Sequence, residues 1–267
     1  MSALAYTVVD SRILLRRNLR RLQRYPSLTL MLVGMPIVFL LLFVYVFGGQ
    51  LGHGLGGRLG GGHAGRSGYL NYLTPGILLM TIAATVQGTA IVVAMDMTGG
   101  IIDRFRTMSI GRGAVLGGHV LAALIQSLAS IAVVLGVAVA LGFRPTADPL
   151  RWLAAIGLLV LFAFALIWLA AALGLAAKSV ETASNTPMFL TMLPFLGSAF
   201  VPVATMPVGL RQFAQYQPFT PVTETLRGLL TGTRIGGNAI GAVGWSVGIA
   251  VVSCMWAARL YQRRQPR

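Results

Sequence analysis

Long apolar segments alternate with short polar ones along most of the chain. Six segments are apolar over about 20 residues, the length at which a helix crosses a hydrocarbon core roughly 30 Å thick. Backbone N–H and C=O groups inside a bilayer need partners within the protein, so such segments fold as helices. The pattern predicts an all-α polytopic membrane protein, residues 1–267 forming a single transmembrane domain. Its six transmembrane helices are expected at residues 28–47, 70–95, 114–142, 152–176, 186–204 and 238–258.

Composition and charge support a membrane protein. Only 10% of the residues are charged and the mean hydropathy is +0.78, whereas soluble proteins carry about 25% charged residues. If the N-terminus lies inside, fourteen Arg and Lys residues fall on the inner side and seven on the outer side. Basic residues hold the ends of spans in the cytoplasm and bind anionic lipid. We therefore expect a multi-pass protein of the plasma membrane with both termini in the cytoplasm. Its basic segments would bind membrane lipids and no nucleic acid.

Residues 1–27 are predicted to form an interfacial amphipathic helix that ends at Tyr25-Pro26-Ser27. At 100° per residue, one face is apolar and the opposite face is basic. The apolar face holds Leu4, Val8, Leu15, Leu19 and Leu22, and the basic face holds Arg16, Arg17, Arg20 and Arg24. The domain would continue through spans one and two (28–95), a cytoplasmic helix (96–113), spans three to five (114–204), an external region (205–237) and span six with a basic tail (238–267).

Prolines interrupt the fifth apolar segment and the region after it. The segment contains Pro187, Pro194 and Pro202, and proline removes a backbone donor and breaks helices. Broken backbone at membrane depth is tolerated where it is buried in protein or lines a cavity. Between further prolines, Val208–Tyr216 and Val222–Leu230 are predicted to be short re-entrant helices in the outer leaflet, with an ordinary exposed loop as the alternative.

Residues suited to catalysis are few. None of the six carboxylates falls at mid-membrane depth, where an ion-coupled transporter usually keeps an ionisable residue. No Ser-His-Asp set, HExxH or Walker motif occurs, so we expect no catalytic, cofactor-binding or metal-binding residues. Mid-depth polar residues would either line a translocation pathway or form hydrogen bonds between packed helices. They are Gln87, Gln126, Ser127, Ser130 and Thr191, of which Gln87, Gln126 and Thr191 are the candidates for the pathway.

A charged island, DMTGGIIDRFRTMSIGRG at residues 96–113, separates spans two and three. As a helix it has an apolar face opposite a charged one. The apolar face holds Ile101, Ile102, Phe105, Met108 and Ser109, and the other face holds Asp103, Arg104, Arg106 and Thr107. Such a helix either rests its apolar face on lipid or fits a groove on a soluble partner.

The island resembles the link between spans two and three in the membrane subunits of type-2 ABC exporters, particularly the daunorubicin-resistance permease group. That link combines an acidic residue, a glycine and a short basic and apolar helix. The matching residues are Asp96, Gly100, Asp103, Arg104, Phe105, Arg106 and Met108, with Ser109 where the family usually has proline.

A second stretch, residues 195–232, resembles the family's signature between spans five and six. Gln217-Pro218 stands where the family commonly has Asn-Pro. The resemblance is carried by Pro202, Met206, Pro207, Leu210, Pro218, Phe219, Thr220, Leu226, Arg227 and Gly228. With the six spans and the N-terminal helix, it extends over nearly the whole chain.

The resemblance implies a transport subunit and not an enzyme. Two six-span permeases, identical or homologous, would pair and dock two copies of a soluble ABC ATPase, which binds the ATP and Mg. The residues that couple this chain to the ATPase would be Asp96, Gly100, Ile101, Ile102, Asp103, Arg104, Phe105, Arg106 and Met108. An external gate would include Pro202, Met206, Pro207, Pro218, Phe219 and Arg227.

The expected function is ATP-driven export of a hydrophobic compound, either an antibiotic-like drug or a lipid, from the cytoplasm or the inner leaflet. The absence of an ATP-binding motif in this sequence means that the energy would come from another chain. An ion-coupled secondary transporter that works alone is the main alternative. A membrane scaffold or an integral-membrane enzyme is the third, and the lack of convergent polar residues argues against the enzyme.

Overall fold

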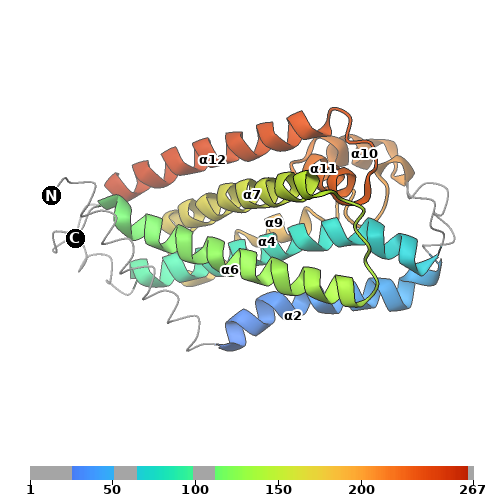
Figure 1. The fold of residues 1–267 in the computed structure, drawn as a ribbon. Coiled ribbons are helices and arrows are strands. Elements are labelled where there is room, and N and C mark those ends of the chain that lie inside the picture. The colour runs from blue at the N-terminus through green and yellow to red at the C-terminus, as the bar shows by residue number, and fades with distance from the viewer. Residues whose placement is uncertain (1–25, 51–64, 99–111, 264–267) are drawn as a thin grey trace.

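The computed structural model describes residues 26–50, 65–98 and 112–263. Throughout these residues the regular secondary structure is helical, without a strand. The long helices lie side by side as a bundle (Figure 1). They are α2 (Pro26–Leu42), extended by the π-helical turn Phe43–Phe47, α4 (Arg66–Thr98), α6 (Arg112–Ala140), α7 (Pro149–Ala176) and α12 (Asn238–Arg263). The prediction of an all-α polytopic membrane protein is confirmed.

Five helices in the described residues are long and apolar enough to cross a membrane. They cover Leu32–Gln50, Arg66–Thr98, Leu116–Ala140, Pro149–Ala176 and Asn238–Tyr261. These ranges match five of the six predicted spans, with ends that differ by a few residues. Most extend beyond the apolar run because a helix continues through polar residues at the membrane surface as long as its backbone hydrogen bonds remain satisfied.

The predicted fifth span, residues 186–204, is not one continuous helix. After α8 (Val180–Asn185), the chain forms α9 (Met188–Met192), a series of turns and the short 3-10 helix η2 (Val203–Thr205). The breaks coincide with the three prolines identified in the sequence, each of which lacks the N–H that would continue a helical ladder. The described residues therefore contain five long helices and, in place of the predicted fifth span, one broken segment; whether that segment crosses the membrane stays a prediction.

Both short helices predicted after this segment are present. The helix α10 spans Val208–Tyr216, as expected, and α11 spans Phe219–Thr231, starting three residues earlier than expected. The alternative of an ordinary loop without helices is therefore wrong for these two segments. Whether these helices enter the outer leaflet stays a prediction.

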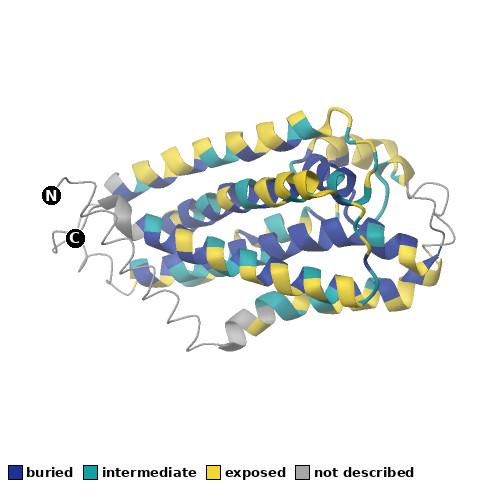
Figure 2. Cartoon of the chain, viewed as in Figure 1, coloured by how far each residue is buried: buried dark blue, intermediate teal, exposed yellow. Residues whose placement is uncertain are grey.

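The core of the bundle is built around α4, the most deeply buried of the long helices. Dark blue residues follow it along most of its length, whereas α12 is largely exposed (Figure 2). Packing against α7 is close because Gly174 carries no side chain: a Cβ there would lie 2.7 Å from the backbone oxygen of Ala90 on α4. The central helix thus touches most of the elements around it, including α2, α6, α7, α8, α9 and α11.

The two ends of the bundle carry different elements (Figure 1). One end, which we call the cap end, holds α10, α11, the start of α4 and the connection 141–148 between α6 and α7. The opposite end, which we call the basal end, holds the end of α4, the start of α6 and the end of α12. The predicted N-terminal interfacial helix (1–27) and the predicted coupling helix (96–113) lie outside the described residues, except for residues 26–27 at the start of α2, 96–98 at the end of α4 and 112–113 at the start of α6.

Candidate functional site

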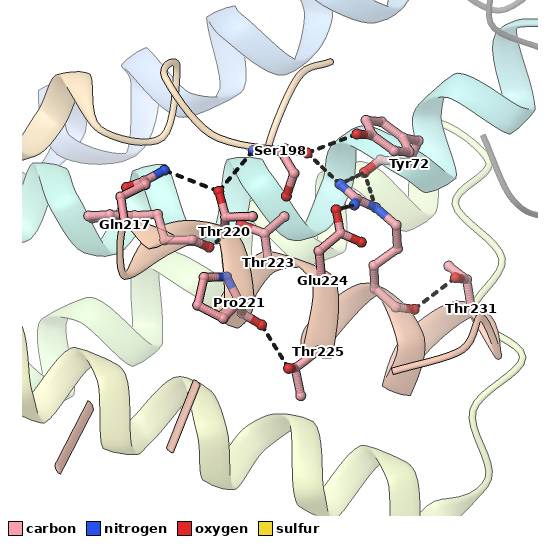
Figure 3. A network of polar contacts seen from close by, with 11 residues as sticks. Tyr72, Ser198, Gln217, Thr220, Pro221, Thr223, Glu224, Thr225 and Thr231 are labelled. Carbon is pink, nitrogen blue, oxygen red and sulfur yellow. Dashed lines mark hydrogen bonds and ion pairs between the residues drawn. The ribbon is translucent and has the colours of Figure 1, made fainter. Parts of the chain in front are cut away.

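The main polar site lies at the cap end, where α11 and the broken segment cross the start of α4 (Figure 3). Its central residue is Arg227 on α11, which is only 3% exposed. Its guanidinium donates to the backbone oxygen of Tyr72 from Nε (3.2 Å) and Nη2 (3.1 Å), and from Nη2 to that of Ser198 (2.8 Å). The fourth contact is an ion pair between Nη1 and Oε1 of Glu224 at 2.6 Å. We call Tyr72, Ser198, Glu224 and Arg227 the clamp.

Two tyrosines on α4 complete the attachment of the broken segment. The hydroxyl of Tyr72 donates to the backbone oxygen of Ser198 (3.0 Å), and its ring lies under the guanidinium, 3.7 Å from centroid to carbon. One turn earlier, the hydroxyl of Tyr69 donates to the backbone oxygen of Phe200 (3.2 Å). Each buried aromatic ring therefore contributes apolar contact and one hydrogen bond to a backbone that has no helical partner.

Two glycines let these three segments approach closely. A Cβ on Gly76 of α4 would lie 2.5 Å from the Cβ of Ala199. A Cβ on Gly197 would overlap the side-chain nitrogen of Gln217. Because real Cβ atoms do not tolerate such approaches, position 76 needs glycine, and a side chain at position 197 would displace the side chains of Gln217 and Thr220. Residues 197–200 therefore lie tightly between α4 and α11.

Gln217, just before α11, and Thr220 in its first turn satisfy further polar groups of the broken segment. The side-chain nitrogen of Gln217 donates to the backbone oxygen of Leu193 (3.2 Å) and to Oγ1 of Thr220 (3.2 Å). The same Oγ1 accepts from the backbone N–H of Ser198 (3.3 Å). These bonds supply partners to backbone groups outside a regular helix, which a broken segment buried in protein requires.

Local sequence explains why a helix forms here. Pro218 stands at the N-cap of α11 and Pro221 in its first turn, where helical N–H groups have no intrahelical acceptor. Thr223 and Thr225 donate their hydroxyls to the carbonyls four residues earlier, at 2.7 Å each. Gly232 ends the helix with φ +76°, a conformation that favours glycine. The helix is therefore defined at both ends by its own sequence.

The clamp is suited to holding structure and not to chemistry. Its one cation is matched by one carboxylate, and three further guanidinium N–H groups reach neutral backbone oxygens, so the buried charge is compensated. No nucleophile is paired with a base in it, and the described residues contain no group of three or more His, Cys, Asp or Glu side chains that could hold a metal. Its physical effect is to join α4, the broken segment and α11 into one unit.

The predicted gate residues divide into two groups. Pro218, Phe219 and Arg227 lie on or beside α11, and the ring of Phe219 packs edge-on against Phe162 of α7 at 5.2 Å. The other three, Pro202, Met206 and Pro207, flank η2 and the start of α10, where Pro207 is exposed. The first group therefore lies in the contact between α11 and the bundle, and the second lies in the connection between the broken segment and α10.

Several residues of this site were missed in the sequence. They are Tyr69, Tyr72, Gly76, Ser198 and Glu224. One signal was available: Glu and Arg three residues apart, as at 224 and 227, face each other on a helix. The contacts of α4 with residues 197–200 left no such local signal because they join positions more than 120 residues apart.

The three predicted pathway residues lie on different elements. Gln87 donates to the backbone oxygen of Ser184 (3.3 Å) and so joins α4 to α8. Thr191 donates to the backbone oxygen of Met188 (2.7 Å) within its own turn, and Gln126 is half-buried on α6. These hydrogen bonds are internal to the fold, and a role in a pathway stays a prediction.

At the basal end, the described part of the predicted coupling region is Asp96. Its side chain is buried (2% exposed), and its Oδ2 lies 3.3 Å from Nε2 of His119 on α6. The other predicted coupling residues lie outside the described residues. They are Gly100, Ile101, Ile102, Asp103, Arg104, Phe105, Arg106 and Met108.

Long apolar helices around a buried central one, with a broken, proline-rich segment packed under short cap helices, define a multi-pass membrane protein of the transporter class. Broken helices supported by neighbouring helices recur in transporters. Comparison with family models makes the assignment specific. Residues 10–231 match the model of the ABC-2 type transporter, and the chain belongs to this family.

Two relatives carry names that describe drug resistance. The daunorubicin resistance ABC transporter permease protein DrrB1 of Streptomyces coeruleorubidus is 29% identical over 250 residues, covering 93% of this chain and 84% of the relative. The probable doxorubicin resistance ABC transporter permease protein DrrC of Mycobacterium tuberculosis is 25% identical over 189 residues, covering 69% of this chain and 68% of the relative. The resemblance inferred from the sequence is confirmed, and the chain is a membrane component of transport.

Proposed function

We propose that this chain is the membrane-spanning permease subunit of an ATP-driven exporter, powered by a separate ABC ATPase. The observation that carries the proposal is the family match over residues 10–231. The clamp supports the proposal, because its charge-compensated contacts hold helices together, as a transport subunit requires. It does not have the paired nucleophile and base of an enzyme site. The ATP and Mg would be bound by the partner, in two copies.

Orientation follows from charge and from the arrangement of the ends. The cap end would face outward and the basal end the cytoplasm, because the basic segments before span one and after span six favour the inner side. The described parts of the three loops expected outside gather at the cap end, which supports the same topology (Figure 1). Both termini would then be cytoplasmic.

The coupling element would be the amphipathic helix at 97–110, between α4 and α6. Its apolar residues would fit a groove on the ATPase, and Asp103, Arg104 and Arg106 would select the partner by charge. The support is its place in the chain: α4 ends at Thr98 and α6 begins at Arg112, both at the basal end. Closure of the ATPase dimer would move these two helices as rigid bodies.

The short helices α10 and α11 at the cap end would form the outer gate. Because the clamp joins α11 and residues 197–200 to α4, the gate would move with α4 and would not open by separate motion of α11. A second six-span permease, identical or homologous, would supply the other half of the pathway, and Gln87, Gln126 and Thr191 would contribute polar groups to it.

The cargo would be a hydrophobic compound, either a drug or a lipid. The names of the two relatives refer to resistance to daunorubicin and doxorubicin, so an amphiphilic aromatic antibiotic of this kind is the first substrate to test. The apolar, sparsely charged bundle supports a cargo that enters from the cytoplasm or the inner leaflet.

The test is co-purification followed by transport. Affinity-tagged chain is purified from its native membrane and the associated proteins are identified, with an ABC ATPase expected. Vesicles containing this complex should export daunorubicin only with ATP, and the purified chain alone should show no ATPase activity. Daunorubicin movement by the chain alone under a proton or sodium gradient would refute the proposal and indicate a secondary transporter.

A further inference from the structure

A buried carboxylate and a buried imidazole face each other at the basal end. Oδ2 of Asp96 lies 3.3 Å from Nε2 of His119, and the two side chains are 2% and 6% exposed. Asp96 is two residues before the end of α4, and His119 lies in the second turn of α6 after Arg112. The pair therefore joins the two helices that flank residues 99–111.

Apolar residues close to the pair along both helices are buried as well. Val93 on α4 and Leu116 and Val120 on α6 are all buried, at no more than 4% exposure. Burying a polar group costs free energy that its hydrogen-bond or ion-pair contacts offset, so losing the contact between these two groups would be unfavourable. Displacement of α4 relative to α6 at this level would separate the two groups, so their contact opposes that displacement.

The burial of Asp96 also changes its predicted role. The sequence resemblance placed it among residues that couple to the ATPase, but a carboxylate that is 2% exposed and directed at α6 is not available to a soluble partner. We propose that Asp96 and His119 are positioning residues that brace α4 against α6. The brace keeps both helix ends at a fixed spacing, so that force on the segment between them moves the two helices together. The functional half of this inference rests on the proposed function.

The structural half is tested on the purified full chain. In a Cys254→Ser background, spin labels are placed at the exposed positions Met95 on α4 and Leu121 on α6. Pulsed electron paramagnetic resonance then measures the distribution of distances between the labels. We expect a narrow distribution in the parent, broadening in Asp96→Asn and more in His119→Leu, and recovery in the exchange variant D96H/H119D.

The matched control is Thr89→Val. Thr89 is a buried polar residue of α4 whose hydroxyl donates to the backbone oxygen of Thr85 in the same helix (2.8 Å). The Thr89→Val substitution removes a buried polar group without removing a hydrogen bond to another helix, so the distribution of distances between the labels should not change.

The functional half uses the complex with the co-purified ATPase in vesicles. The quantity measured is daunorubicin exported per ATP hydrolysed, together with the affinity of the ATPase for the permease. In His119→Leu we expect the ratio to fall roughly 2- to 30-fold, the range for residues along a coupling element, with unchanged ATPase affinity. Recovery of the ratio in D96H/H119D would separate positioning from a general loss of folding.

The outcomes are distinguishable. An unchanged distance distribution in His119→Leu would overturn the brace, and loss of ATPase affinity in Asp96→Asn with an unchanged distribution would show that Asp96 contacts the partner instead. If no ATPase associates with the parent chain, the proposed function fails, while the distance measurement still decides whether the pair braces the helices.

Discussion

The clamp leads to a quantitative prediction about Arg227. Substitution by methionine keeps much of the apolar stem but removes three hydrogen bonds to backbone oxygens, an ion pair at 2.6 Å and the contact with the ring of Tyr72. Breaking a buried charge pair by removing one partner costs about 3–5 kcal/mol. Glu224 is 31% exposed and keeps some solvation, so we expect a loss near the lower limit, about 3 kcal/mol.

Such a loss is large enough to measure in detergent. At roughly 2–4 °C per kcal/mol for a chain of this size, Arg227→Met should lower the unfolding midpoint by about 6 °C or more. Tyr72→Phe removes one hydroxyl hydrogen bond and should cost about 1 kcal/mol. The assay is size-exclusion chromatography of fluorescently tagged protein after heating, with both variants and their combination compared at equal concentration.

The matched control is Arg211→Met. Arg211 lies on α10, in the same outer region, and its side chain is exposed. Loss of an exposed arginine typically changes stability by less than about 0.5 kcal/mol. Equal unfolding midpoints for the two arginine variants would refute the view that the clamp holds the cap to α4.

Three further predictions concern packing and coupling. Gly76→Ala should destabilise the fold by about 1–3 kcal/mol, because its methyl would meet backbone packed against α4, whereas Gly157→Ala, with nothing within 4 Å, should be neutral or slightly stabilising in the same heating assay. Phe219→Ala should cost about 3–5 kcal/mol because the ring is 1% exposed, and an unfolding midpoint equal to that of the parent would contradict this. Reversing the charges of Asp103 and Arg104 together should uncouple daunorubicin export from ATP hydrolysis while leaving membrane insertion intact, and full transport by the double variant would show that these charges do not couple the subunits.

Much of the fold could be predicted because membrane depth imposes a strong local rule. A segment of about 20 apolar residues must satisfy its own backbone, so helix type and approximate limits follow from hydropathy alone. The prolines predicted the broken segment in the same way, because the loss of the backbone N–H depends on the proline alone and not on distant residues. The prediction of α10 at Val208–Tyr216 matched both ends because prolines stand just before and after it.

The site was predictable only in part. Arg227 and Phe219 were identified through a family signature, which indicated that they matter but not what they touch. Apart from Glu224, the partners of Arg227 are backbone oxygens. Every residue carries a backbone oxygen, so the identities of residues 72 and 198 do not predict these contacts. Asp96 was identified by the same route, but its 3.3 Å approach to His119 left no local signal because the two residues lie on different helices.

The sequence by itself determined that the chain is helical, crosses a membrane several times, breaks at its fifth apolar segment and belongs with ABC-2 transporters. These properties depend on residues close together in the chain or on a resemblance. Only the tertiary structure decided that α4 is the central helix, that Tyr72 and Ser198 are joined through Arg227, and that Asp96 of α4 lies beside His119 of α6. Such contacts depend on the register and rotation of packed helices, which small residues such as Gly76 and Gly174 set by allowing close approach.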